Sequence, residues 1–71
     1  MNEIAEVKEQ VGLTAGKIWQ TLSTGGPLTV TQLKKKLNGE GELLNFALGW
    51  LAREDKIELI PEKKSFRIQL R

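Results

Sequence analysis

Apolar residues recur at helical intervals through the first third of the chain. Every third or fourth residue between Ile4 and Leu22 is apolar, and this spacing places the side chains on one face of an α-helix. The stripe consists of Ile4, Val7, Val11, Ala15, Ile18 and Leu22, with Trp19 beside it. It runs without a break in phase, so we expect one helix over residues 3–23. The alternatives are a kink near Gly12 or a second helical segment that Thr14 caps.

A second helix follows the Gly-Gly-Pro sequence at 25–27, where proline and glycine end the first. Thr29 precedes Gln32 by three positions, which is the spacing of a capping box, so this helix is expected to begin at Val30. Asn-Gly at 38–39 ends it, because both residues tolerate the left-handed backbone of a helix C-terminus. Its apolar face consists of Val30, Leu33 and Leu37.

A third helix is expected over residues 41–54. At about 100° per residue, one narrow sector of its surface is apolar and should face the core. This sector contains Leu44, Ala47, Leu48 and Leu51, with Leu43 and Trp50 at its edge. The face pointing away carries Glu42, Asn45, Phe46, Gly49 and Arg53.

The last sixteen residues alternate between apolar and polar, the pattern of half-buried strands. We expect strands in "KIELI" (56–60) and "SFRIQL" (65–70), with Lys63 and Lys64 at the tip of the turn between them. The predicted fold is therefore α+β and mainly α, with three helices and a C-terminal two-stranded β-hairpin in a single domain over residues 1–71. Leu44, Leu48, Leu51, Ile57 and Ile68 should form its core.

The composition excludes several kinds of chemistry. The 71 residues include no Cys and no His, so we expect no disulfide, no zinc site and no His-based nucleophile. We accordingly expect no enzyme activity, no metal and no cofactor. A chain without Cys fits the cytoplasm. No apolar run approaches the roughly 18 residues of a membrane span, and the N-terminus lacks a signal-peptide pattern, so no membrane partner is expected.

The net charge of +2 conceals two basic clusters. One is the run Lys34, Lys35 and Lys36 in the second helix, and the other is Lys63, Lys64, Arg67 and Arg71 in the hairpin. Acidic residues lie between them. A protein adapted to duplex DNA concentrates positive charge on one face, whereas this chain has two basic ends around a mixed middle.

The order of elements resembles the winged helix-turn-helix domain. The segment "LTVTQLKKKL" looks like the first helix of that motif, and "LLNFALGWLAREDKIEL" looks like its recognition helix running into the wing. "AGKIWQTL" and "FALGWLAREDKI" are further similar to a group of short stand-alone bacterial winged-helix proteins with no assigned function. The resemblance implies a DNA-binding module, such as a small transcription regulator, whose third helix enters the major groove while the wing touches the backbone or minor groove.

Carried onto this chain, the resemblance assigns DNA contacts to both basic clusters. Lys34, Lys35, Lys36, Lys63 and Lys64 would approach phosphates, with Arg67 in support. Asn45 would read a base, since its amide can pair with adenine N6 and N7. Glu42, Phe46 and Gly49 depart from the usual polar and basic readers, which puts sequence-specific binding in question.

A protein partner is the alternative. Leu43, Phe46 and Trp50 are apolar outside the core face, and aromatic side chains often anchor protein interfaces. Packing of Leu43 and Trp50 within the domain is the simpler account. A homodimer is a further expectation: the first helix would be roughly 30 Å long, so Ile4 and Val7 would project beyond the core and need a partner. Together with Val11 they are the candidates for this interface. Gly12 and Gly16 are expected to serve tight packing inside the domain.

Overall fold

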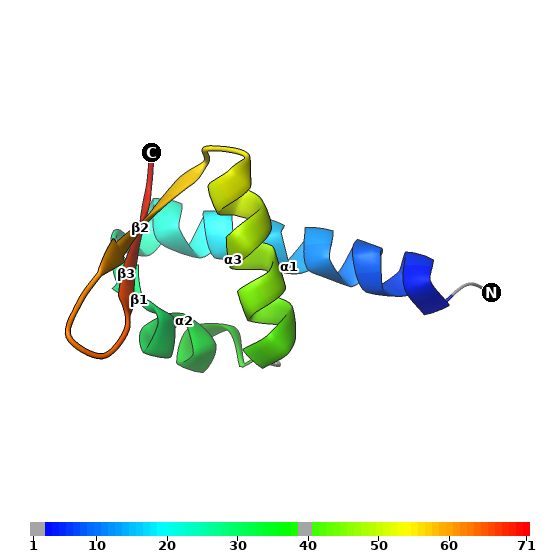
Figure 1. Ribbon diagram of the computed structural model, residues 1–71, viewed down its shortest axis with the longest axis horizontal. Coiled ribbons are helices and arrows are strands. Elements are labelled where there is room, and N and C mark those ends of the chain that lie inside the picture. Colours follow the sequence, from blue (N-terminus) through cyan, green and yellow to red (C-terminus); the bar gives the residue numbers. More distant parts are fainter. Residues whose placement is uncertain (1–2, 39–40) are drawn as a thin grey trace.

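The computed structural model describes residues 3–38 and 41–71 (Figure 1). Its elements in chain order are α1 (Glu3–Gly25), β1 (Leu28–Thr29), α2 (Val30–Leu37), α3 (Gly41–Arg53), β2 (Ile57–Pro61) and β3 (Phe66–Leu70). The expected fold class, with three helices followed by a C-terminal hairpin, is confirmed. The boundaries differ slightly: α1 continues to Gly25, α3 ends at Arg53, and each strand of the hairpin begins one residue later than expected.

Helix α1 is continuous through both of its internal glycines, so the single-helix interpretation holds. It ends where Gly26 adopts a φ of 77°, and the Gly26 N–H donates to the Leu22 carbonyl at 2.9 Å. A left-handed residue after the last turn is a common way to satisfy the final carbonyls of a helix, and glycine adopts that conformation without steric cost. Pro27 then prevents the helix from resuming.

Helix α2 has the caps that its sequence predicts. The Gln32 N–H donates to the Thr29 hydroxyl at 3.1 Å, and the Thr29 N–H donates to the Gln32 side-chain oxygen at 2.8 Å. At the other end Asn38 is left-handed, with φ 49° and ψ 37°, and its N–H donates to the Lys34 carbonyl at 3.0 Å. Gly39, expected to end the helix together with Asn38, lies outside the described residues.

The strands form a three-stranded antiparallel sheet in the order β1-β3-β2. Leu28 pairs with Ile68, and Ile57 pairs with Leu70. The sequence predicts only the hairpin, with residue 28 as an extended link. Two residues are too few to show a period of two, so the pairing of β1 becomes visible only when the chain is folded.

The core lies between the helices and the inner face of the sheet. All five residues predicted to form it are buried, and Ile18, Leu33 and Ile68 are its largest fully buried side chains. The complete set is Ala15, Ile18, Leu22, Leu28, Leu33, Leu44, Ala47, Leu48, Leu51, Ile57 and Ile68. Helix α3 crosses α1 on one side of this core, and the sheet covers another (Figure 1).

Two parts of the molecule extend beyond the core. Leu59 and Phe66 continue the inner face of the hairpin but are exposed: Leu59 lies on the edge strand β2, and Phe66 lies at the end of β3 next to the turn. The N-terminal part of α1 also projects beyond α3, which gives the molecule dimensions of 41 × 23 × 22 Å (Figure 1). Every residue from 3 to 10 is exposed. The described helices include none that is both long and apolar enough to cross a bilayer.

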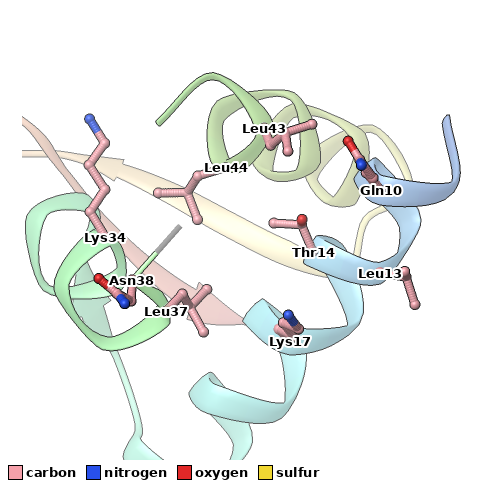
Figure 2. Close-up of a pocket in the computed structure, with 9 residues that line it drawn as sticks. All are labelled: Gln10, Leu13, Thr14, Lys17, Lys34, Leu37, Asn38, Leu43 and Leu44. Atoms are coloured by element: carbon pink, nitrogen blue, oxygen red, sulfur yellow. The ribbon is translucent and has the colours of Figure 1, made fainter. Parts of the chain in front are cut away.

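A hollow of about 360 Å³ remains where the three helices meet (Figure 2). Its wall includes Thr14 and Lys17 from α1, Lys34 and Leu37 from α2, and Leu43 from α3. These residues come from three helices, so no single spacing in the sequence relates them all. Lys17 and Lys34 make the wall of this hollow basic.

Candidate nucleic-acid and protein interfaces

The solvent-facing surface of α3 carries few groups that could contact a nucleic acid. Glu42, Asn45, Phe46, Gly49 and Arg53 are all exposed, as their spacing predicts. A Cβ built at Gly49 would meet no atom within 4 Å, so the centre of this surface is open. The Asn45 amide is suited to pair with an adenine edge, whereas Arg53 lies in the last turn of the helix. Glu42 places a negative charge in the first turn of the helix.

The three consecutive lysines of α2 are exposed but do not share one direction. Successive residues on a helix are separated by about 100°, so the three side chains spread over roughly 200° of its surface. Lys34 points toward the start of α3: a Cβ added to Gly41 would lie 3.6 Å from the Lys34 Cε. A flat surface of a binding partner can therefore contact two of these three lysines more readily than all three.

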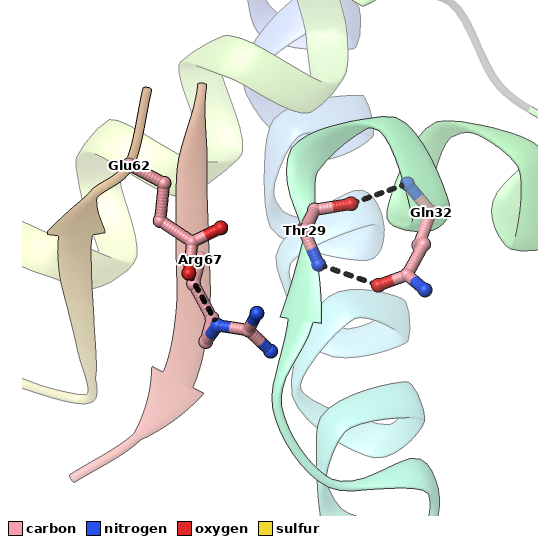
Figure 3. Close-up of polar contacts among 4 residues, drawn as sticks. All are labelled: Thr29, Gln32, Glu62 and Arg67. Carbon is pink, nitrogen blue, oxygen red and sulfur yellow. Dashed lines mark hydrogen bonds and ion pairs between the residues drawn. The ribbon is translucent and has the colours of Figure 1, made fainter. Parts of the chain in front are cut away.

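The turn between β2 and β3 presents a pair of lysines. Lys63 and Lys64 are exposed, and the Glu62 N–H donates to the Ser65 carbonyl at 2.9 Å, which closes the turn around them. Arg67 is engaged differently, because its Nε donates to a Glu62 carboxylate oxygen at 2.7 Å (Figure 3). This ion pair offsets the charge of Arg67, so the two lysines are the uncompensated cations of the turn.

The fold brings the basic groups of α2 and of the hairpin to one edge. In Figure 1 the β2–β3 turn, α2 and the beginning of α3 lie along the lower edge of the molecule. Figure 3 shows Arg67 on β3 beside β1, where the strand leads into the capped start of α2. The segments that carry Lys34–Lys36 and Lys63–Lys64 are thus separate in the sequence but lie along one edge of the folded chain, whereas Arg71 lies at the other end of the hairpin and pairs with Asp55 at 3.1 Å.

Exposed apolar side chains concentrate on α1 and α3. Six of the eight large apolar residues exposed in the described chain lie there: Ile4, Val7, Leu13, Trp19, Phe46 and Trp50. Phe46 is 57% exposed, as the position of this residue on the outward face of α3 predicts.

The expectation that Trp50 packs within the domain is wrong, since this side chain is 50% exposed. Leu43, for which the same packing was expected, is partly buried. Together Leu43, Phe46 and Trp50 recur at i, i+3 and i+7 and form a second apolar stripe on α3.

Trp50 and Trp19 border a groove of about 280 Å³, which we call the tryptophan groove. Its lining includes Gly12 and Gly16 from α1 and Lys56 from the turn after α3. A Cβ at either glycine would meet no atom within 4 Å. The expectation that these glycines serve tight packing inside the domain is therefore wrong, because the space beside them is open. The juxtaposition of the two tryptophans has no signal in the sequence, where they are 31 positions apart.

The exposed part of the α1 stripe consists of the two residues expected to project beyond the core. Val11 is partly buried and packs against the core, while Ile4 and Val7 are 70% and 46% exposed. The described residues include no cluster of three His, Cys, Asp or Glu side chains arranged to hold a metal ion.

Two helices in a helix-turn-helix arrangement, followed by a hairpin with a basic turn, define a winged helix-turn-helix protein. The chain belongs to the family described as Winged helix-turn-helix domain (DUF2582), whose model matches residues 7–70. It is 42% identical over 65 residues to the uncharacterized protein MJ1608 of Methanocaldococcus jannaschii, an alignment that covers 87% of this chain and 91% of that protein. Its fold is similar to the solution NMR structure of protein BT2368 from Bacteroides thetaiotaomicron, with a TM-score of 0.76 and 33% identity over 89% of this chain and 77% of the other.

Proposed function

We propose that the protein is a small cytoplasmic DNA-binding module that contributes to transcription regulation and holds duplex DNA mainly through its phosphates. The observation that supports this proposal is the exposure of uncompensated lysines on α2 and on the β2–β3 turn, at one edge of a fold that commonly binds DNA. Lysines in two elements flanking α3 would contact the backbone on both sides of the groove that the helix enters.

The surface of α3 supports weak discrimination between sequences. Phosphate contacts position a protein on DNA, whereas contacts to base edges carry the sequence information. Asn45 is the one base-reading amide on this surface, and one good bidentate pair contributes about 1–3 kcal/mol of discrimination. Glu42 opposes a close approach of phosphates. We therefore propose a module with limited sequence preference rather than a highly specific reader.

The experiment is a fluorescence-anisotropy titration of mixed-sequence duplex DNA at several salt concentrations. The logarithm of the binding constant should fall linearly with the logarithm of the salt concentration, by about 0.9 for each phosphate contact. A Lys63→Ala/Lys64→Ala variant should flatten this slope by up to about two units. A Lys8→Ala/Lys17→Ala variant removes the same charge from α1 and should leave the slope near that of the parent protein. Equal slopes in the two variants would contradict a role for the turn.

A second function is favoured by one specific observation, the exposure of Phe46 on α3. A large aromatic side chain in the centre of a solvent-facing surface is typical of the anchor of a protein interface. On this account the fold is a protein-interaction module, either for a different protein or for a second copy that pairs through the N-terminal helix. The absence of DNA binding at low salt would favour this account, because phosphate contacts are strongest under those conditions.

A further inference from the structure

An exposed amphipathic helix and an exposed apolar groove occur together in this molecule. The helix is the N-terminal arm, which we define as residues 3–10 of α1; every residue of it is exposed, and it extends beyond α3 (Figure 1). The groove is the tryptophan groove, which opens between Trp19 and Trp50 at the crossing of α1 and α3. Neither the arm nor the groove includes the lysines of α2 or of the β2–β3 turn.

We infer that the arm of one copy binds in the tryptophan groove of a second copy, around a two-fold axis. On α1, residues Ile4, Lys8, Gly12 and Gly16 follow one another at four-residue intervals and form one ridge of the helix surface. When two such ridges pack antiparallel, Ile4 of one copy lies against Gly16 of the other, and Lys8 lies against Gly12. Each copy supplies one arm and one groove, which is the reciprocity that a two-fold interface requires.

The glycines of this ridge support a close approach by a second helix. Glycine inside a helix costs about 1 kcal/mol relative to alanine, so two of them are a substantial cost in a small domain. Within the chain nothing occupies the space beside either glycine, since an added Cβ would meet no atom within 4 Å at Gly12 or at Gly16. A backbone arriving from another molecule would use that space, because glycine permits the closest approach of one backbone to another.

The charges of the two surfaces are complementary. The arm carries Glu3, Glu6 and Glu9 against the single Lys8, which gives it a net charge of −2. The lining of the groove contains one charged residue, Lys56. An acidic helix would therefore be attracted to this lysine, which favours correct orientation during association.

The apolar surface is large enough for a modest dimer. With roughly 200 Å² for each aromatic side chain, the half-exposed Trp19, Phe46 and Trp50 present on the order of 300 Å² of apolar area. An interface of standard size buries about 800 Å² on each partner, of which roughly 450 Å² is apolar. Ile4, Val7 and the open backbone of the glycines supply most of the difference.

This inference goes beyond DNA binding, and either proposal can fail while the other stands. The lysines that would contact phosphates lie outside the interface, but Phe46 lies on the face of α3 that would enter the groove, so the dimer and the DNA complex would compete for this face. In the dimer Phe46 would contact the second copy instead of a base, which accounts for an aromatic residue at a position where a DNA reader would be polar.

The test is sedimentation equilibrium of the intact chain from low to high micromolar concentration, together with tryptophan fluorescence. Trp19 and Trp50 are the only tryptophans of the sequence, and both border the groove. Dimer formation should therefore shift their emission to shorter wavelength and reduce quenching by acrylamide as the concentration rises. A chain that stays monomeric at the highest concentration would overturn the inference.

Two variants locate the interface. A Cβ at Gly12 meets no atom within 4 Å among the described residues, and leucine favours the helix more than glycine does. Gly12→Leu should therefore give a folded protein whose dimer dissociation constant is raised about tenfold or more, because the side chain occupies the space beside the ridge. Phe46→Ser should weaken the dimer similarly. Phe66→Ser is the matched control, because Phe66 is 46% exposed but lies on the hairpin. A dimer that both test variants leave unchanged would place the interface elsewhere and overturn the inference, whereas DNA binding by the Gly12→Leu monomer would show that the two activities are separate.

Discussion

Gly49 leaves the centre of the solvent-facing surface of α3 without a side chain that could contact a ligand. It lies in the interior of the helix between Asn45 and Arg53, where any other residue would supply a side chain. Apart from its chain neighbours and the backbone of its own helix, no atom of the described residues lies within 4 Å of the position that its Cβ would occupy. The glycine is therefore not required by packing, and its effect is to leave a gap in the surface that would face the DNA.

Gly49→Arg should increase both stability and DNA affinity. Replacement of glycine by arginine in an exposed helix interior is expected to add up to about 1 kcal/mol to the free energy of unfolding. The new guanidinium would add about one phosphate contact and steepen the salt dependence by roughly 0.9. Anisotropy titrations measure the second effect, and urea unfolding measures the first.

Gly49→Ala is the control for this prediction, because alanine provides the same gain in helix stability without the charge. If the arginine and alanine variants bound DNA with the same salt dependence, the surface of α3 would not lie against the duplex.

The β2–β3 hairpin combines basic and acidic groups in a small space. Glu62 pairs with Arg67 beside the turn that presents Lys63 and Lys64. Both members of this pair are well exposed, and exposed ion pairs contribute about 0–1 kcal/mol to stability. The carboxylate therefore matters more for the charge of the turn than for the stability of the hairpin.

Glu62→Gln should strengthen DNA binding at low salt with little change in stability. The substitution removes a negative charge beside the lysines and leaves Arg67 free to approach a phosphate, so the salt dependence should steepen by up to about one unit. Glu58→Gln is the matched control. It changes the net charge equally but lies farther along β2, where the Glu58 carboxylate accepts a hydrogen bond from the Gln69 amide at 2.9 Å. Equal effects of the two substitutions would attribute the change to net charge rather than to the turn.

The whole domain depends on a small core that all the elements share. Leu33 is fully buried and joins α2 to the other two helices and to the sheet. A single domain of about this length has a free energy of unfolding on the order of 4–10 kcal/mol. Removal of one large buried side chain therefore affects a major fraction of the total stability.

Leu33→Ala should lower the free energy of unfolding by about 2–5 kcal/mol, through lost burial and the cavity that remains. Leu13→Ala removes the same atoms from a side chain that is 67% exposed, and it should change stability by less than about 0.5 kcal/mol. Urea unfolding of both variants at a concentration where the protein is monomeric measures the difference. A loss below 1 kcal/mol for Leu33→Ala would contradict the central position of this residue.

The features that the sequence predicts best depend on short stretches of chain. The capping box of Thr29 and Gln32, the left-handed Asn38 and the helix that ends before Pro27 each involve residues within a few positions of one another. The buried faces of the three helices follow from the 3.6-residue period in the same way. The basic clusters and the outward position of Phe46 were likewise readable from local spacing, because each depends on one element alone.

Other features depend on contacts between distant segments, and only the folded chain decides them. The pairing of Leu28 with Ile68, the exposure of Phe66 beyond the helices and the meeting of Trp19 with Trp50 each join residues from different elements. The alternation within a strand says which residues share a face but not how far the helices cover that face. The periodicity of the sequence thus determined the helices, their caps and most of the core. Tertiary packing decided which apolar residues stayed on the surface, because burial depends on what lies opposite each side chain.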